Sequence, residues 1–274
     1  MLMKRKTKLI LSIINIIVAI VIVFPLLYAL SLSFMQPGEI IEYPPKFLPS
    51  SINFNNYEEA LKAVPLFKFI KNSFIVSIAV TIGQIITASL SAYAFAFFDF
   101  KGKKILFMVV LSTMMIPAEA TIISNFLTVS TWGWNDSLGV LIVPFLTSAM
   151  GIFLMRQFYL TIPKEMKEAS KIDGCSNFMF LIKILIPMSK PAIASLGIYT
   201  FINTWNQYLW PLLTINNEDK RTVQIGISML QFAEGSNYGV ILAGAILILV
   251  PSIIIFIIGQ KSLVLGMTQG AVKG

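Results

Sequence analysis

The sequence predicts an all-α membrane protein with six transmembrane helices. Of its 274 residues, 56% are hydrophobic and 12% are charged, which is far more apolar surface than one soluble core of this length needs. The apolar residues gather in stretches of roughly 20 residues, the length with which a helix crosses a bilayer core of about 30 Å. A β-barrel would show short segments of alternating apolar and polar residues, and these stretches do not alternate.

Six such stretches define the expected spans. In chain order they cover residues 9–33, 72–97, 105–129, 138–160, 191–213 and 238–260. The first span follows the basic residues Lys4, Arg5, Lys6 and Lys8, which could also begin a cleaved signal peptide. Its apolar run is too long for a signal peptide and is followed by no small-residue cleavage site, so we expect a retained first helix.

The distribution of basic residues predicts that both chain termini are cytoplasmic. Basic residues near helix ends are retained on the cytoplasmic side, and with the amino terminus inside, 15 of the 21 Lys and Arg fall on that side. They are Lys4, Arg5, Lys6, Lys8, Lys101, Lys103, Lys104, Arg156, Lys164, Lys167, Lys171, Lys183, Lys190, Lys261 and Lys273. The chain then divides into a cytoplasmic amino terminus (1–8), a transmembrane domain (9–260) and a cytoplasmic tail (261–274).

Composition argues against several classes of function. A net charge of +8 could indicate nucleic-acid binding, but the cations are spread as an orientation signal beside anionic lipid and form no basic groove interleaved with aromatic residues. We therefore expect membrane lipid, and no nucleic acid, as a partner. With a single cysteine, Cys175, and no histidine, we expect no disulfide, no metal site and neither zinc-dependent nor Ser-His hydrolysis.

The connection between the first two spans, residues 34–71, is long and contains five prolines. It should be mostly extended, with a short helix near residues 57–63 that Asn53, Asn55 or Asn56 could begin. This connection either packs against the protein or offers a docking surface for an external partner.

A polar segment, residues 161–190, interrupts the apolar sequence between the fourth and fifth spans. Pro163 suits the first turn of a helix. After a turn, a second helix should open at Ser176 or Asn177 and end before Ile186-Pro187. The expected result is a helix-turn-helix projection into the cytoplasm.

The first helix of this projection has the chemistry of a docking surface. Small Ala169, Ser170 and Gly174 would let another protein approach closely, while Glu168 and Asp173 offer charge-assisted contacts. Gly174 also supplies a left-handed stop to the helix. We therefore interpret these five residues as a joint that fits into a socket on another protein.

The fifth span carries more polar and aromatic side chains than lipid depth normally holds. They are Asn203, Trp205, Asn206, Gln207, Tyr208 and Trp210. Amides can hydrogen-bond a solute in a cavity, and aromatic faces suit sugar rings. These residues either line a solute pathway or form an interfacial aromatic belt and packing surface. Among them we expect Asn203, Asn206 and Gln207 to face a pore, and we keep Tyr208 as a further pathway residue.

Glu119, which follows Ile116-Pro117 in the third span, is the main candidate for proton chemistry in the membrane. It could instead lie near the outer interface, where the proline breaks the helix, and face water or a partner. No second buried carboxylate or base is placed to share a proton, which favours the position at the outer interface over a proton relay. We keep Glu119 among the candidate pathway residues.

One motif in the polar segment is specific. It reads Glu168-Ala169-Ser170-Lys171-Ile172-Asp173-Gly174-Cys175, followed by Ile186-Pro187-Met188-Ser189-Lys190-Pro191-Ala192. This pattern resembles the EAA loop of binding-protein-dependent ABC importer permeases, which usually has Glu-Ala-Ala, a three-residue interval to the Gly, and Leu-Pro further on. Ser170 and Ile186 are mild departures from it.

The resemblance extends over the whole chain, since residues 153–158, 205–212 and 266–274 are similar to the second permease subunit of carbohydrate-type importers. It implies a type I ABC importer permease fold with six spans and a cytoplasmic coupling helix, in the bacterial cytoplasmic membrane. It also implies a heterodimer with a second permease, two cytoplasmic ATPase subunits and an external solute-binding protein.

By the same resemblance, Glu168, Ala169 and Gly174 insert into a cleft on the ATPase, and Asp173 supports the loop. The resemblance also implies that this chain is not an enzyme and binds no cofactor, while its partner subunits bind ATP and Mg²⁺. Consistent with this, the chain has no Gly-rich phosphate loop ending in Gly-Lys-Ser/Thr. The terminal residues Thr268, Gln269, Gly270 and Lys273 are expected either to fray or, as in the maltose-type branch, to reach between the two ATPases.

The solute is left open between a sugar and sn-glycerol-3-phosphate. Residues 205–212 with 230–235 look most like the glycerol-3-phosphate branch, but sugar importers share nearly all of that pattern, and a phosphate ligand would need cations that these spans do not obviously supply. The alternative function is a secondary transporter or channel that works without an ATPase. Such a protein should show ion-coupling residues or internal repeats, and we find neither in the sequence.

Overall fold

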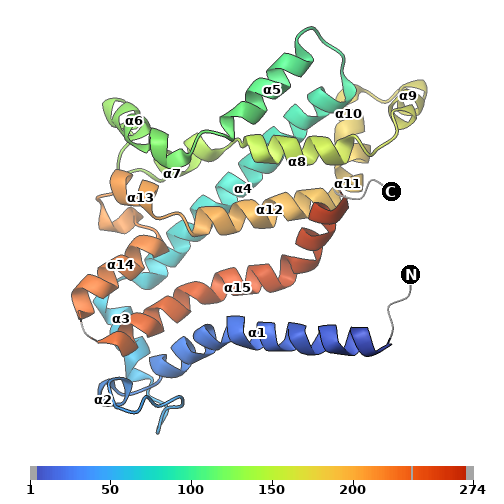
Figure 1. Cartoon of the computed structure of the whole chain (residues 1–274). Coiled ribbons are helices and arrows are strands. Elements are labelled where there is room, and N and C mark those ends of the chain that lie inside the picture. The colour runs from blue at the N-terminus through green and yellow to red at the C-terminus, as the bar shows by residue number, and fades with distance from the viewer. Residues whose placement is uncertain (1–4, 236, 270–274) are drawn as a thin grey trace. The chain divides into compact units, whose positions relative to one another are not determined.

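The structure is a computed structural model of the 274-residue chain, and it describes residues 5–235 and 237–269. All regular elements in these two ranges are helices (Figure 1), which confirms the predicted all-α class. In chain order they are α1 (Arg5–Ser33), α2 (Pro37–Ile40), α3 (Asn55–Ala63), α4 (Leu66–Phe97), α5 (Lys103–Thr113), α6 (Ala118–Thr131), α7 (Leu138–Ile142), η1 (Val143–Phe145), α8 (Ala149–Tyr159), α9 (Glu165–Ile172), α10 (Asn177–Phe180), η2 (Leu181–Leu185), α11 (Ile186–Met188), α12 (Lys190–Trp205), α13 (Leu209–Thr214), η3 (Glu218–Lys220), α14 (Val223–Glu234) and α15 (Tyr238–Gln269).

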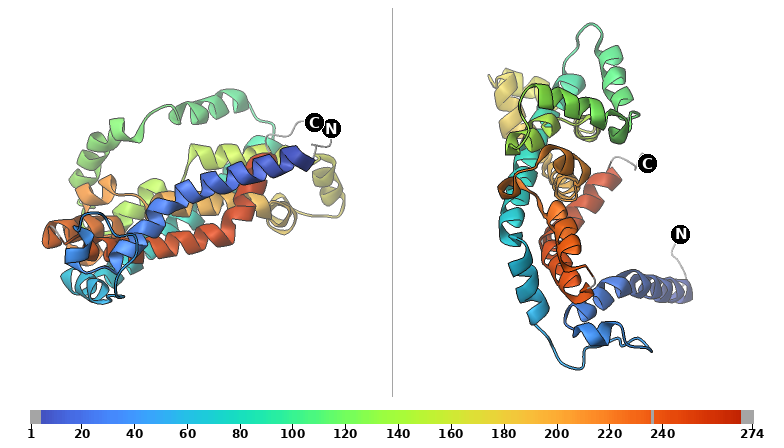
Figure 2. Two further views of the ribbon diagram at one scale, coloured as in Figure 1. Left: turned by 60° about the horizontal axis from the view of Figure 1, so that its bottom comes forward. Right: turned by 90° about the vertical axis from the view of Figure 1, so that its left-hand side faces the viewer.

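Three of the expected spans are single helices, and other apolar regions are broken. Leu9–Ser33, Leu66–Phe97 and Tyr238–Gln260 are each long and apolar enough to cross a membrane alone. Three further pairs pass the same test together but are bent: α5 with α6 by 93°, α7 and η1 with α8 by 42°, and α10–α11 with α12 by 79°. The turn between α5 and α6 is plain in Figure 2. Counting each bent pair as one span gives six.

A proline lies in each of the three breaks or within two residues of it. Pro117 is the N-cap of α6, Pro144 lies in the 3₁₀ turn η1, and Pro191 lies in the first turn of α12. Proline has no backbone N–H, and its ring clashes with the carbonyl four residues earlier. A helix therefore usually starts at a proline and does not continue through one. The expected single helix over 191–213 is wrong for another reason, because α12 already ends at Trp205 and α13 starts at Leu209.

The second helix of the polar segment runs further than predicted. Instead of ending before Ile186-Pro187, it continues from α10 through η2 and α11 to Met188. The segment η2 is a π-helical turn, in which the Ile186 N–H bonds the Leu181 carbonyl. This wider hydrogen-bonding pattern accommodates Pro187, which has no N–H to donate.

The chain forms two compact units, of which the first comprises Met1–Phe67 and Gly226–Val250. In this unit, the buried Asn56 amide of α3 donates to the carbonyls of Ser33 and Met35, both at 2.8 Å, and so holds α3 against the end of α1. The short helix predicted near residues 57–63 begins at Asn55, where the Asn53 side chain accepts the Asn55 N–H. No residue in the most apolar window of α1 is buried, as expected for a surface that lipid or another subunit covers.

The second unit, Lys68–Ile225 with Pro251–Gly274, holds its helices together through small residues. A Cβ added to Gly151 of α8 would lie 3.2 Å from Leu196 of α12 and 3.4 Å from Ala88 of α4, so glycine permits close contact among the three helices. The core around this contact also contains Met155 and Tyr159, both fully buried. These helices form the frame that positions the features described below.

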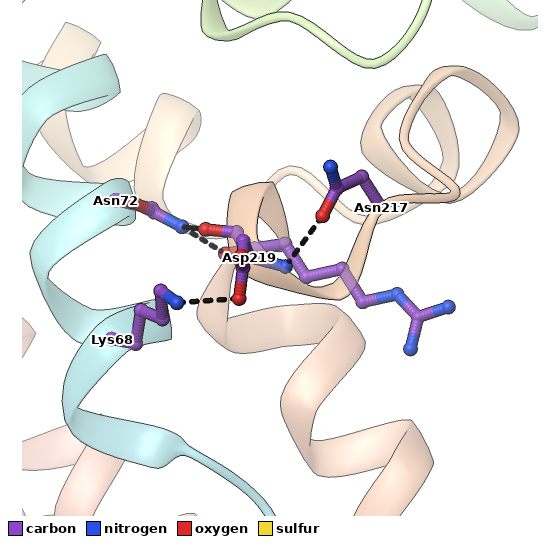
Figure 3. A network of polar contacts seen from close by, with 5 residues as sticks. Lys68, Asn72, Asn217 and Asp219 are labelled. Carbon is purple, nitrogen blue, oxygen red and sulfur yellow. Dashed lines mark hydrogen bonds and ion pairs between the residues drawn. The ribbon is translucent and has the colours of Figure 1, made fainter.

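The loop that contains η3 is tied to the start of α4 (Figure 3). The Lys68 ammonium pairs with the Asp219 carboxylate, and the Asn72 amide donates to the carbonyls of Asp219 and Arg221, both at 2.9 Å. The Asn217 side chain accepts the Asp219 N–H. These contacts provide hydrogen-bond donors for the carbonyls of Asp219 and Arg221, which accept no hydrogen bond within a helix.

Asp136 fastens the same loop to the segment that follows α6. Its carboxylate accepts the N–H groups of Asn216 and Asn217, the latter at 2.7 Å. Asp136 adopts a positive φ of 57°, which aspartate tolerates better than most residues. The Asn217 N–H, followed by Asn216 and the charge of Lys220, holds the pKa of Asp136 below its ordinary value, although partial burial opposes this shift.

We expect Asp136→Ala to loosen this connection without unfolding the protein. Removing the carboxylate leaves two backbone N–H groups without their acceptor, at a cost of about 1.4 kcal/mol after allowing for solvent screening. This free energy corresponds to a rise of about tenfold in hydrogen exchange at the amides of Asn216 and Asn217. Exchange mass spectrometry measures this directly.

The stabilisation that Asp136 provides should also depend on pH. Because its pKa is lowered in the folded protein, its contribution is present above the ordinary aspartate value of about 3.9 and is lost as pH falls through the lowered pKa. Unchanged exchange in Asp136→Ala at neutral pH would contradict the assignment.

Candidate functional site

Helix α9 presents one continuous exposed face. Glu165, Glu168, Ala169 and Ile172 follow the spacing that places residues on one side of a helix, and all four are exposed. Ile172 has 88% of its surface exposed, which is unusual for a large apolar side chain beside two acids. Such a mixed, protruding face is typical of a surface that another protein covers.

The opposite face of α9 is buried. Lys167 and Ser170 are 8% and 5% exposed, and the Ser170 hydroxyl donates to the Lys167 carbonyl at 2.8 Å. Of the five residues predicted for docking, the structure therefore places Glu168, Ala169, Asp173 and Gly174 outward and Ser170 inward.

The end of α9 has the expected left-handed stop. Asp173 is the C-cap, and Gly174 has φ +76°. The next residue, Cys175, donates its N–H to the Ser170 carbonyl at 2.8 Å, which closes the turn as in other glycine-terminated helices. A Cβ at Gly174 would meet no atom within 4 Å, so backbone conformation, and not lack of space, requires glycine here.

Lys167 attaches α9 to the end of α4. Its ammonium donates to the Phe97 carbonyl at 3.1 Å and lies 3.7 Å from the centre of the Phe98 ring, with Tyr93 and Phe97 also within 6 Å. A cation over aromatic faces is attracted by their negative charge density. Sequence reasoning missed this role and treated Lys167 only as a cytoplasmic charge.

The buried environment of Lys167 disfavours its positive charge. Burial lowers the pKa of its ammonium below the ordinary lysine value, the positive charge of Lys171 lowers it further, and Asp99 opposes these effects. The carbonyl and the aromatic rings are what offset the lost hydration of the cation. Aromatic residues at the end of a span followed by a lysine-bearing helix are a weak sequence signal for such a tether.

A polar cavity of about 720 Å³ lies at the break between α7 and α8. It is lined by Gln84, Thr113, Met114, Ala118, Pro144, Phe145, Thr147, Ser148, Ala149, Met150, Tyr199, Thr200, Asn203, Thr204 and Gln207. In Figure 1, α8 and α12 run from the region of this break towards α9. The cavity and the exposed face of α9 thus lie towards opposite ends of the same helices.

Gln84 of α4 organises the wall of this cavity. Its amide donates to the Phe145 carbonyl at 2.9 Å, and its side-chain oxygen accepts the Thr200 hydroxyl at 2.9 Å. One turn further along α4, the Thr87 hydroxyl donates to the Leu146 carbonyl at 2.7 Å. These side chains satisfy carbonyls that the helix break leaves without partners.

The residues predicted for a solute pathway separate into two groups. Asn203 and Gln207 line the polar cavity. Asn206 lies elsewhere and accepts the Gln224 amide at 3.2 Å, while Tyr208 is 39% exposed outside the lining. Glu119 is exposed in the first turn of α6, next to lining residue Ala118. Sequence reasoning missed Gln84, whose signal was a lone amide inside an apolar span.

The predicted contacts of the tail fall mostly outside what the structure describes. Helix α15 continues beyond the expected end of the last span and includes Thr268 and Gln269 in its backbone. Gly270 and Lys273 lie outside the described residues. In the ranges that are described, His, Cys, Asp and Glu form no group of three or more that could hold a metal ion.

Comparison with known proteins identifies the family. A model described as "Binding-protein-dependent transport system inner membrane component" matches residues 84–264, more than half of the chain. The chain belongs to this family. The matched region includes both the exposed face of α9 and the residues that line the polar cavity.

Two relatives among the permeases of this family match nearly the whole chain. The arabinooligosaccharides transport system permease protein AraQ of Halalkalibacterium halodurans is 33% identical over 99% of this chain and 100% of its own length. The sn-glycerol-3-phosphate transport system permease protein UgpE of Rhizobium meliloti is 36% identical over 91% of this chain and 92% of its own length.

A solved structure shares the fold. A chain of a bacterial ABC transporter involved in the import of the acidic polysaccharide alginate superposes with a TM-score of 0.83 at 24% identity, covering 95% of this chain and 99% of that chain. The protein is therefore a multi-pass membrane permease with the type I ABC importer fold.

We expect Lys167→Ala to loosen α9 in this permease. The change removes the donor to Phe97 and the cation above Phe98, so hydrogen exchange at the amides of α9 should rise about tenfold. Lys171→Ala is the matched control, because Lys171 lies on the same helix and is exposed. Equal exchange in the two variants would show that the tether contributes nothing to the position of α9.

Proposed function

We propose that this chain is one of two permease subunits of a sugar-type ABC importer and that α9 is its coupling helix, which receives the movement of an ATPase. The observation that carries the proposal is the exposed face of α9, formed by Glu168, Ala169, Ile172, Asp173 and Gly174. Its acids can make charge-assisted hydrogen bonds, and Ile172 can fill an apolar pocket at the centre of an interface. Ser170 supports this face from inside through its bond to the Lys167 carbonyl.

The proposed topology has six spans with both termini in the cytoplasm. It is supported by the three single spans and three bent pairs, and by the position of most basic residues. In this topology α9 and the end of α4 face the cytoplasm, while the loop that contains η3 faces outward. Thr268, Gln269, Gly270 and Lys273 then belong to a cytoplasmic tail that can reach the ATPases.

The proposed partners are a second permease, two ATPase subunits and an external solute-binding protein. Membership of the binding-protein-dependent family supports all three. A related fold has been solved in complex with an alginate pentasaccharide-bound periplasmic protein, at 16% identity and a TM-score of 0.66. The partner ATPases would bind ATP and Mg²⁺, and this chain would act as a transport subunit without catalysis of its own.

We further propose that the polar cavity beside Gln84 is this subunit's share of the solute pathway. Gln84, Asn203 and Gln207 provide amides at a depth where polar groups are expensive unless they have a function or partner. The hydroxyls of Thr200 and Tyr199 lie on the same lining. Asn206, Tyr208 and Glu119 are outside the lining of this cavity and form no part of the proposed wall.

The two relatives belong to transport systems named for arabinooligosaccharides and for sn-glycerol-3-phosphate. None of the described residues that line the polar cavity is charged, and hydroxyl-rich, uncharged solutes suit such amide and hydroxyl groups. This favours a sugar for the part of the pathway that this chain provides.

We expect Glu168→Lys to leave membrane insertion intact but to lower ATP-driven uptake about tenfold or more, because a cation replaces an acid in the centre of the interface. Lys183→Glu is the matched control, since Lys183 is exposed in the same polar segment but lies on η2, outside the face of α9. Gly174→Asp should have a similar effect, because it adds a charged side chain to the proposed interface and is less favourable than glycine at a positive φ. Uptake is measured in vesicles that contain the complete transporter.

Normal uptake in Glu168→Lys would remove the coupling role of α9. Uptake by the purified chain without an ATPase would contradict the importer itself and favour a secondary transporter or channel.

A further inference from the structure

A second cavity gathers three of the four tryptophans of the chain. Its volume is about 360 Å³, and its lining consists of Asn125, Thr128, Val129, Trp132, Trp134, Val143, Pro144, Phe145 and Trp210. Ligand sites typically measure about 300–1,000 Å³ and combine apolar walls with a few polar groups. We call this cavity the tryptophan pocket.

The two exposed tryptophans are held by the end of α6. Gly133, with φ +69°, turns the chain between them, and its N–H bonds the Ser130 carbonyl at 3.0 Å. The Trp134 N–H bonds the Val129 carbonyl, also at 3.0 Å. The rings of Trp132 and Trp134 then meet edge to face, with centroids 5.5 Å apart. This arrangement keeps both rings at the pocket although 61% of Trp132 is exposed.

The third tryptophan forms the fixed part of the pocket. Trp210 is 5% exposed, its indole N–H donates to the Val140 carbonyl at 3.0 Å, and its ring meets Phe145 at 6.1 Å. Asp136, two residues after Trp134, is bonded to the loop that follows α13. The aromatic side chains are therefore positioned before any ligand arrives, which lowers the entropy cost of binding.

The chemistry of the pocket matches one uncharged sugar ring. The C–H face of a pyranose or furanose ring is apolar and packs against an aromatic face, while its hydroxyls can bond the Asn125 amide and the Thr128 hydroxyl on the same wall. None of the residues that line this pocket is a lysine or arginine, the side chains that recognise phosphate. An interfacial aromatic belt would not require the rings to converge on a cavity.

We propose that the tryptophan pocket is a subsite for one neutral sugar unit of an oligosaccharide, next to the polar cavity. The two cavities share Pro144 and Phe145 as walls, so a second sugar unit can occupy the polar cavity. The inference rests on the proposed transport function and identifies its solute class as a neutral saccharide.

Saturation-transfer NMR on the full chain in lipid nanodiscs tests the pocket, with arabinotriose as the probe. We expect saturable transfer to its ring protons, and weaker binding by about threefold to tenfold in Trp132→Ala, Trp134→Ala and Asn125→Ala. Phe178→Ala is the matched control, because Phe178 is 64% exposed, close to the exposure of Trp132, but lies on α10.

Three results would overturn the proposal. They are no transfer to arabinotriose in the unchanged chain, equal transfer in the tryptophan variants and the control, and equally strong, tryptophan-dependent transfer to sn-glycerol-3-phosphate. These outcomes are independent of the uptake assay with Glu168→Lys, so a failed subsite can be distinguished from a failed importer assignment.

Discussion

Backbone carbonyls that are freed where a helix ends or breaks need hydrogen-bond donors, and inside a membrane no water supplies them. In this permease, side chains from neighbouring segments supply them. Gln84 donates to the carbonyl of Phe145, Lys167 to that of Phe97, and Trp210 to that of Val140. Two of these donors serve the bent region of α7, η1 and α8, and the third serves the end of α4.

The same donors lie at the candidate functional features. Gln84 lines the polar cavity and donates to the Phe145 carbonyl there, and Trp210 lines the neighbouring pocket and donates to the Val140 carbonyl. Lys167 fastens α9 to the end of the helix that carries Gln84. We infer that α4 links the exposed face of α9 to the cavity, so that a force on α9 reaches the pathway through a hydrogen-bonded contact.

Much of this could be predicted from the sequence. Apolar length predicts the all-α class, and Gly174 predicts the left-handed end of α9, because only the local conformation of the chain is needed. The bends near Pro144 and Pro191, the π-turn before Pro187 and the inward side of Ser170 depend on tertiary packing, which overrides local sequence preference. Sequence periodicity does not encode such long-range partners, so Gln84 and Lys167 were missed.

The most direct test measures how many solute molecules the complete, reconstituted transporter moves per ATP hydrolysed. If α9 acts on the pathway through Lys167, Lys167→Ala should lower this ratio while ATP hydrolysis continues, and Lys171→Ala should leave it unchanged. An unaltered ratio in Lys167→Ala would contradict the central claim that this tether transmits the movement of α9 to α4.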